Sequence, residues 1–371
     1  MNYNTVSVFF SLLRAGLWGK DVRLSDYEKI DFDELYRLAE EQSVIGVVSV
    51  GLEHAVDTKV PKELVFQFVG QTLQIEQQNT AMNYFIGVLI DRMRKADIYT
   101  LLVKGQGVAQ CYDKPLWRAC GDVDFFLSED NYKKAKLFLR EIAVQTEPEE
   151  APQQHIAFSV DSWMVELHGT LRCGLSRRMD KGLDDIWRDT FYGGNVRSWL
   201  NDRTSVFMLN ESNDAVYIFS HFLKHFYKGG LGLRQICDWC RLLWKYKNTI
   251  DIDKVETLIR KMGLMSEWKA FAAFVVEYLG MPEEAMLLYE ESKKWKIKAE
   301  RIYKFILKSG NFGHNRDMSY YSKYPYLVRK TISFGRRVGD LFNHAMIFPL
   351  DSLRFAPQIV FNGVRSVIRG E

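Results

Sequence analysis

Two carboxylates stand two residues apart in a short apolar segment, Asp122-Val-Asp-Phe-Phe-Leu127, and this segment constrains the fold more than any other. Its β-branched and aromatic residues predict a buried strand. Side chains alternate along a strand, so Asp122 and Asp124 should point to one face while Val123 and Phe125 point to the core. Two ionised carboxylates about 7 Å apart repel each other. A fold that keeps them together therefore needs a cation beside them.

A third acid is predicted on a later strand. Alternation along Trp163–His168 places Glu166 and His168 on one face of that strand. If this strand lies beside the first acidic strand, Asp122, Asp124 and Glu166 converge. Carboxylate oxygens suit Mg²⁺ or Mn²⁺ better than zinc. We therefore expect these three residues to form a catalytic metal site, with His168 either beside the ion or satisfied within the sheet.

Strand and turn signals outline a central α/β unit at about residues 96–200. Ile98–Val103 is apolar and β-branched and ends at Lys104-Gly105. Residues 155–160 and 163–168 alternate and are joined by Asp161-Ser162, which suits a tight hairpin turn. Residues 145–154 are acidic and contain two prolines, so we expect a loop there. One more short strand is plausible at Val206–Leu209.

Helical periodicity dominates on both sides of this unit, over residues 1–95 and 201–371. A capping-box pattern occurs at Asp31-Phe-Asp-Glu34, and Pro61 opens a long helix that reaches Lys95. Further helices are predicted over Asn213–Tyr227, Leu233–Tyr246, Asp253–Met262, Ser266–Leu279 and Pro282–Tyr303. The domain boundaries are therefore expected near residues 95 and 200.

Phosphate-binding residues are predicted between the first strand and the acidic strand. Gly105 and Gln106 begin a helix, where glycine lets backbone N–H groups approach a phosphate and the helix N-terminus favours negative charge. Lys104 adds a positive charge, and Arg118 offers two donors that suit a phosphate. A lone Asp-x-Asp is usually a hairpin end, and a lone Lys-Gly is usually a helix cap. Their combination, in phase with Glu166, favours the functional interpretation.

A second polar group lies on the helix after residue 210. His221, Lys224 and His225 share one helical face, from which Lys224 either reaches a triphosphate or packs on the central unit. Packing is favoured for the two histidines. Asp238 either acts as a base towards the acceptor or pairs with Arg234 four residues earlier, and the ion pair is favoured.

Bulk composition narrows the classes of protein to which this chain can belong. The 371 residues are 47% hydrophobic and 26% charged, as in ordinary folded proteins, and the net charge of +3 gives no clear nucleic-acid signal. Five cysteines, an odd number, fit a reducing compartment, and Cys237 and Cys240 are expected in the core. No uninterrupted apolar run reaches about 18 residues, so we expect no transmembrane segment and a cytoplasmic location.

The C-terminal segment from Tyr321 to Glu371 is basic and aromatic. It contains the apolar stretches Ile347-Phe-Pro-Leu350 and Val367-Ile368. Three interpretations stay open: a solvated helical surface, an oligomer contact, or a weak contact with a membrane interface. Ordinary packing is favoured.

These motifs together resemble a known family. Lys104-Gly105, Arg118, Gly121-Asp-Val-Asp124 and Glu166-Leu-His168 are similar to the uncharacterised bacterial nucleotidyltransferase family of the polymerase-beta-like superfold, over about residues 30–280. Tyr112, His221-x-x-Lys224-His225 and the Gly232 to Asp238 segment also fit it. The resemblance implies an α+β fold, with a mixed-sheet core between N-terminal and C-terminal helical regions. It also implies that Asp122 and Asp124 are the metal pair, Glu166 the third acid and Gly105 the phosphate-loop glycine, while Gln106 stands where serine is usual.

The expected reaction is Mg²⁺-dependent transfer of a nucleotidyl group from an NTP to a hydroxyl or amine acceptor, a small molecule or a protein. Glu166 would complete the metal site or deprotonate the acceptor. Two alternatives stay open. One is a catalytically inactive protein of this fold that binds a ligand or partner, and the other is a phosphotransferase that uses the same metal site.

Overall fold

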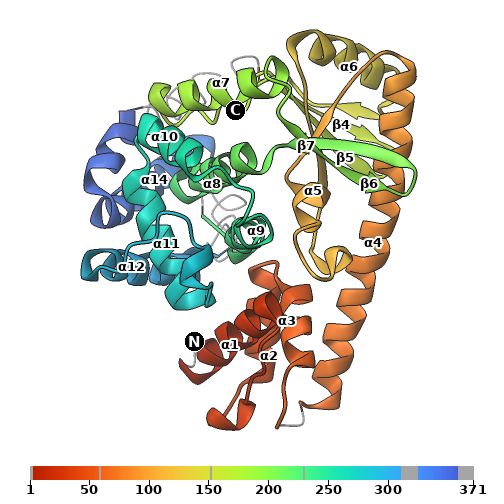
Figure 1. Cartoon of the computed structure of the whole chain (residues 1–371). Helices are drawn as coiled ribbons and strands as arrows, with labels where there is room; N and C mark the ends of the chain where they lie inside the picture. Colours follow the sequence, from red (N-terminus) through yellow and green to blue (C-terminus); the bar gives the residue numbers. More distant parts are fainter. Residues whose placement is uncertain (1–2, 58–59, 151–152, 229, 311–324, 358–371) are drawn as a thin grey trace.

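The computed structural model describes residues 3–57, 60–150, 153–228, 230–310 and 325–357 (Figure 1). Its fold is α+β, as expected: a mixed sheet of seven strands lies among helices. The strand order is β3-β4-β5-β2-β1-β7-β6. The strands are β1 (Leu101–Val103), β2 (Asp122–Phe126), β3 (Gln145–Thr146), β4 (His155–Val160), β5 (Trp163–His168), β6 (Val196–Asn201) and β7 (Thr204–Leu209).

Helices surround this sheet. Before it come α1 (Tyr3–Trp18), α2 (Phe32–Glu41), α3 (Ile45–Glu53) and α4 (Lys62–Lys95). Between its strands lie α5 (Gly105–Ala109), α6 (Glu129–Ile142) and α7 (Arg177–Phe191). After it follow α8 (Glu211–Lys228), α9 (Leu233–Lys245), α10 (Ile252–Met262), α11 (Met265–Leu279), α12 (Lys293–Ser309) and α14 (Tyr326–Ile347).

The two faces of the sheet meet different helices. Val123 and Phe125 of β2 are buried in one apolar cluster with Met82 and Ile86 of α4. Phe126 points to the opposite face and belongs to the other cluster, which includes the C-terminal helices. Figure 1 accordingly shows α4 on the side of the sheet away from α8, α9 and α11. Strand alternation therefore directs Asp122 and Asp124, in phase with Phe126, towards the C-terminal helices.

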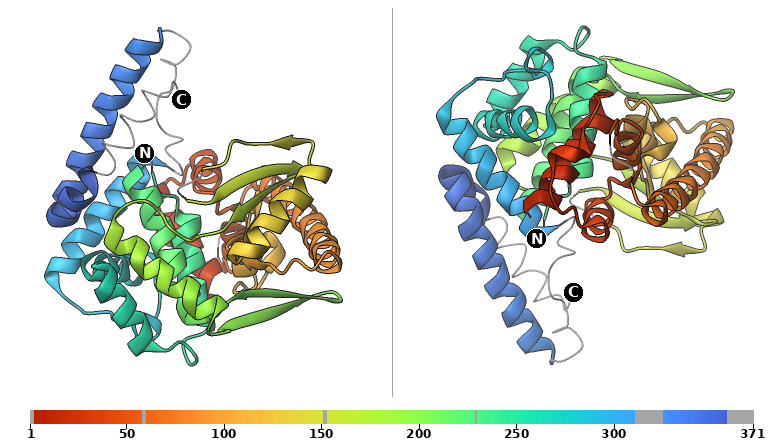
Figure 2. Two further views of the ribbon diagram at one scale, coloured as in Figure 1. Left: turned by 90° about the horizontal axis from the view of Figure 1, so that it is seen from above. Right: turned by 90° about the horizontal axis from the view of Figure 1, so that it is seen from below.

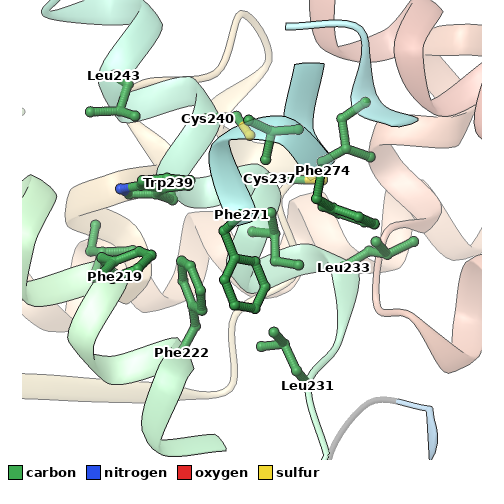
Figure 3. Close-up of a cluster of buried hydrophobic side chains, with 14 of the residues drawn as sticks. Phe219, Phe222, Leu231, Leu233, Cys237, Trp239, Cys240, Leu243, Phe271 and Phe274 are labelled. Atoms are coloured by element: carbon green, nitrogen blue, oxygen red, sulfur yellow. The ribbon is translucent and has the colours of Figure 1, made fainter. Parts of the chain in front are cut away.

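Aromatic side chains fill the centre of the C-terminal helical region (Figure 3). Phe219 of α8 lies 5.1 Å from Trp239 of α9 and 6.2 Å from Phe271 of α11, between ring centroids. Cys237 and Cys240 lie in this cluster, as expected from their apolar neighbours. All five cysteines are free and buried. This packed core holds α8 and α9 in a fixed position relative to the sheet.

Several sequence expectations are confirmed by these elements. Asp31 caps α2 by accepting a hydrogen bond from the Glu34 amide at 2.9 Å. The Asp161-Ser162 hairpin pairs Val160 with Trp163 across β4 and β5. The helix predicted from Pro61 to Lys95 is α4.

Other expectations are wrong. β6 was not predicted, because it is an edge strand with no buried side chain and therefore has no apolar face to reveal it. The domain boundary near residue 200 stays a prediction; residue 200 falls inside β6, and the sheet continues to Leu209. β3 lies in the predicted loop 145–154. No single helix covers residues 282–303, because α12 begins only at Lys293. In the non-helical stretch before it, the Leu287 carbonyl accepts a hydrogen bond from the Trp268 indole at 2.8 Å.

The described part of the C-terminal segment is helical. Figure 2 shows α14 reaching beyond the other C-terminal helices. Residues 349–357 form a further helix. Ile347 and Phe348 are buried, so these two residues of the apolar stretch pack inside the protein, whereas Leu350 is exposed. Residues 321–324 and 358–371, with Arg365, Val367-Ile368 and Arg369, lie outside the described residues. In the described part of the chain, no helix is both long and apolar enough to span a bilayer.

Candidate metal and nucleotide site

Three carboxylates meet at the middle of the sheet. β2 and β5 are parallel neighbours, and their register places Asp124 directly opposite Glu166. One oxygen from each of Asp122, Asp124 and Glu166 lies within 4.8 Å of the others. Asp124 is buried, whereas Asp122 is exposed at the start of β2. The predicted convergence of three acids is thus present in the structure, and their oxygen-only donor set suits a hard divalent cation.

The acid cluster carries more negative charge than its neighbours balance. The negative charge of Asp124 raises the pKa of the Asp122 carboxyl above its usual value. The Lys104 ammonium lies beside these acids, with its Nζ 2.6 Å from Asp124 Oδ1. One lysine therefore faces three acids. A divalent cation would stabilise this arrangement, so the residues present fit such an ion.

Lys104 lies between the end of β1 and the start of α5. Its backbone has a positive φ of 57°, which turns the chain sharply at the end of the strand. Burial opposes its charge, but the nearby acids, Asp124 foremost, raise the pKa of Lys104 above its usual value. Lys104 Nζ also lies 3.5 Å from His221 Nε2 of α8. Lys104 therefore connects the acid cluster with the helical side of the site.

Two histidines face the same acids from the β4–β5 hairpin. His168 Nε2 lies 2.8 Å from Asp124 Oδ1 and 3.4 Å from Glu166 Oε2. His155 Nε2 lies 3.1 Å from the same Glu166 oxygen. Burial works against an ionised Glu166, but the hydrogen bonds from these histidines and the charge of Lys104 lower its pKa well below the usual range. Glu166 is therefore a carboxylate at neutral pH.

A cavity of about 360 Å³ opens in front of this cluster. A volume of this size falls within the range of small-molecule sites. Acidic residues of the sheet form one wall, and basic residues of α8 and α9 form the other. The lining residues that bear on the chemistry are Lys104, Gly105, Arg118, Asp122, Asp124, His155, Glu166, His168, Tyr217, Ser220, His221, Lys224, His225, Arg234 and Asp238. The cavity thus presents metal-binding and anion-binding groups to the same space.

Arg118 pairs with a carboxylate of α9, and its predicted phosphate contact stays a prediction. Its guanidinium donates to both carboxylate oxygens of Asp238, with Nε 3.0 Å from Oδ1 and Nη2 2.5 Å from Oδ2. Tyr112 also donates to Asp238 Oδ1, at 2.9 Å. Arg118 and Asp238 are both buried. This pair joins the loop before β2 to α9, so we assign Arg118 a structural role, and the predicted Asp238–Arg234 pair is wrong.

Arg234 has one buried donor without a hydrogen-bond partner. Its Nη1 donates to the Ala119 carbonyl at 2.8 Å, while its buried Nε has no hydrogen-bond partner. Burial, followed by the charge of Arg118, lowers the pKa of Arg234. A buried guanidinium with an unused N–H at a cavity wall is typical of an anion-binding position. The sequence interpretation missed it because it paired Arg234 with Asp238.

Gln106 turns away from the cavity. Its side-chain amide is buried and donates to Asn79 Oδ1 of α4 at 2.6 Å, so it anchors α5 to α4. Its side chain is absent from the cavity lining and does not take the place of the usual serine. Gly105 does line the cavity. A Cβ at Gly105 would lie 3.1 Å from Cys120 Sγ, and its φ of +41° also favours glycine.

The polar face of α8 lies against the cavity, with Lys224 in its lining. His221 Nε2 and His225 Nε2 are 3.4 Å apart. Burial, with Lys104 as the next cause, lowers the pKa of His221 well below its usual value, and burial lowers that of His225 to about 3. Both histidines are therefore neutral at pH 7. The sequence favoured packing of these two histidines on the central unit. In the structure both of them line the cavity.

His155 is a further site residue that was not predicted. The expected turn at Asp161-Ser162 contained the signal, because pairing Val160 with Trp163 also pairs His155 with His168. Extending the hairpin register from this turn would therefore have predicted that His155 lies near Glu166.

Comparison with known protein families gives a match. The model of a family described as uncharacterised nucleotidyltransferase matches residues 28–280, which is more than half of the chain and includes every site residue discussed above. No curated protein and no solved structure gives a significant match.

Proposed function

This chain belongs to the uncharacterised nucleotidyltransferase family, and from that premise we propose that it transfers a nucleotidyl group from an NTP to a hydroxyl or amine acceptor, with Mg²⁺ or Mn²⁺ bound by Asp122, Asp124 and Glu166. The observation that carries the proposal is the convergence of these carboxylates at a cavity whose opposite wall is basic. Such an ion, when bound, neutralises phosphate charge and polarises the reacting oxygens.

The basic wall supplies the contacts for the triphosphate. Arg234 lines the cavity from α9, and Lys224 lines it from α8. Lys104 contributes a third positive charge, although it is already paired with Asp124. Charge-assisted hydrogen bonds of this kind are roughly twice as strong as neutral ones. In this proposal Arg234 takes over the role first predicted for Arg118.

The chemistry requires an exchange of bonds at the α-phosphorus. The acceptor oxygen or nitrogen forms a bond to that phosphorus, the bond to the bridging oxygen breaks, and pyrophosphate leaves. Glu166 is a poor candidate for the base that takes the acceptor proton, because its lowered pKa makes it weakly basic. We therefore assign Glu166 to the metal site. His221 also lines the cavity, but burial lowers its pKa well below the usual value, so it is a weak base too, and we assign the acceptor proton to solvent water.

Calorimetric titration with ATP and with GTP, with and without Mg²⁺, tests the proposal. We expect the wild type to bind at least one NTP in a Mg²⁺-dependent manner, and the Asp122→Asn variant to lose that dependence. Asp253→Asn, at the exposed start of α10, is the matched control and should behave as wild type. Equal binding with and without metal would contradict the mechanism.

The product separates the remaining functions. Nucleotidyl transfer releases pyrophosphate, which a coupled colorimetric assay detects during a screen of hydroxyl and amine acceptors. Release of an NDP instead would indicate a phosphotransferase. Metal-dependent NTP binding without turnover of any acceptor would indicate a protein that has kept the site for binding alone.

A further inference from the structure

The β4–β5 hairpin carries a second group of metal-binding side chains beside the acid cluster. His155 lies directly opposite His168 across the antiparallel pair, and Glu166 lies two residues before His168 on the same face. The ligand atoms of all three residues lie within 4.8 Å of one another. Because these residues come from regular paired strands, their spacing is set by the sheet and does not depend on a loop.

Two of the three distances within this group are close to those around a tetrahedral ion. Ligands bound at about 2.0–2.1 Å in tetrahedral geometry are about 3.3–3.4 Å apart. The Nε2 atoms of His155 and His168 lie 3.1 and 3.4 Å from Glu166 Oε2. Both imidazoles therefore already point the same nitrogen at one carboxylate oxygen. These contacts are N–H to carboxylate hydrogen bonds, and metal binding would replace their protons.

The donor set differs from that of the neighbouring acids. Two imidazole nitrogens and one carboxylate oxygen suit zinc and related transition ions, whereas Mg²⁺ prefers oxygen ligands. Three protein ligands leave a coordination position open, as in catalytic rather than structural zinc sites. All three residues line the cavity, and the His155 and Glu166 side chains are about one quarter exposed, at 26% and 24%. The open position would therefore face the same space as the proposed nucleotide.

We propose that His155, Glu166 and His168 form a transition-metal site of the zinc class, distinct from the Mg²⁺ site and sharing Glu166 with it. An ion there would hold a water or an acceptor hydroxyl beside the acid cluster. This inference goes beyond the proposed transfer reaction, because it concerns metal binding in the absence of any nucleotide. Its failure would leave the Asp122 and Asp124 pair untouched, so the two proposals can fail separately.

Competition titration tests the site directly. The full-length protein is stripped with a chelator and titrated with Zn²⁺ against a chromogenic chelator, without nucleotide. We expect one equivalent of Zn²⁺ in the wild type, and at least about 100-fold weaker binding in His155→Gln, since even the loss of a group that only supports a ligand costs about 10–100-fold. His155 is the cleaner position, because His168 also contacts Asp124.

Two control variants identify the ligands. His54→Gln removes a histidine far from the cavity lining, and Asp122→Asn disables the acid cluster while leaving both site histidines; each should keep Zn²⁺ affinity within about threefold. Wild-type protein without tight Zn²⁺ binding, or a His155→Gln variant that binds as wild type, would overturn the proposal. Equal loss in Asp122→Asn and His155→Gln would also overturn it, because the ion would then belong to the acid cluster.

A measurement on the wild-type protein tests the site even if a variant does not fold. X-ray absorption at the zinc edge of the one-equivalent complex should show two imidazole ligands and no sulfur. A spectrum with sulfur ligands would assign the ion to cysteines, and one without imidazole scattering would assign it to carboxylates alone. Either result would overturn the site.

Discussion

Asp124 and Glu166 lie directly opposite each other on the parallel strands β2 and β5, and His168 Nε2 contacts both carboxylates, at 2.8 and 3.4 Å. Strand pairing thus brings together two acids that are 42 positions apart in the chain, 166 minus 124. Asp122 joins them from the same face of β2. The site is therefore built by strand pairing, and we expect the two aspartates to contribute differently to stability.

Asp124→Asn should destabilise the protein, whereas Asp122→Asn should not. Asp124 is the ion-pair partner of the largely buried Lys104, and removing one member of a buried pair costs roughly 3 kcal/mol. Asp122 is repelled by Asp124, so neutralising it should change the free energy of unfolding by less than about 1 kcal/mol, towards stability. Urea denaturation of the metal-free proteins measures both changes. Equal destabilisation by the two variants would show that repulsion within the cluster is unimportant.

Arg118 and Arg234, which both line the cavity, should respond in opposite ways to substitution. Arg234→Gln should weaken NTP binding about tenfold or more with little loss of stability, because it removes a charged donor that has an unpaired Nε. Arg118→Gln should instead lower the free energy of unfolding by about 3–5 kcal/mol, because Asp238 would stay buried without its partner. Calorimetry and urea denaturation distinguish the two effects. A stable Arg118→Gln variant with weakened NTP binding would return Arg118 to the phosphate site.

The sequence predicted the acid cluster because that prediction depends on local rules. Strand alternation places Asp122 and Asp124 on the same face of their strand. The turn at Asp161-Ser162 determines which face of the following strand carries Glu166. The predicted pair of Arg234 with Asp238 is wrong because the actual partner of Asp238 is non-local. Arg118 and Asp238 are far apart in sequence, and a bidentate contact in a buried setting prevails over the weaker helical pair of Arg234 with Asp238.

Glu267 should make stability fall as pH rises. It is fully buried on α11, where burial and then the charge of Asp351 raise its pKa from 4.5 to about 8. Between these values the unfolded carboxyl ionises while the folded one keeps its proton, so stability present below pH 4.5 is lost progressively up to about pH 8. The loss is on the order of 5 kcal/mol.

Glu267→Gln tests that pH dependence. Its neutral amide should flatten the stability profile between pH 5 and 8 and make the variant more stable than wild type at pH 8. Urea denaturation at several pH values measures it, with Glu284→Gln at an exposed position as the control that keeps the wild-type slope. An unchanged slope in Glu267→Gln would mean that other groups govern the pH response.

Two helical glycines should respond oppositely to alanine. At Gly51 of α3 a Cβ would lie 2.0 Å from the Leu12 carbonyl oxygen of α1, so Gly51→Ala should cost about 3 kcal/mol or more by forcing the helices apart. At Gly70 of α4 a Cβ would meet nothing within 4 Å, so Gly70→Ala should gain about 0.5–1 kcal/mol from helix propensity. Thermal denaturation of both variants measures the contrast. A tolerated Gly51→Ala would contradict the close approach of α1 and α3.

A crystal structure with Mn²⁺ and a non-hydrolysable NTP tests the central claim most directly, because anomalous scattering locates the ion independently of the atomic model. We predict an anomalous peak bound by Asp122, Asp124 and Glu166, with the triphosphate between that ion and the side chains of Lys224 and Arg234. A nucleotide bound outside this cavity, or manganese absent from the three carboxylates while the NTP is bound, would contradict the account.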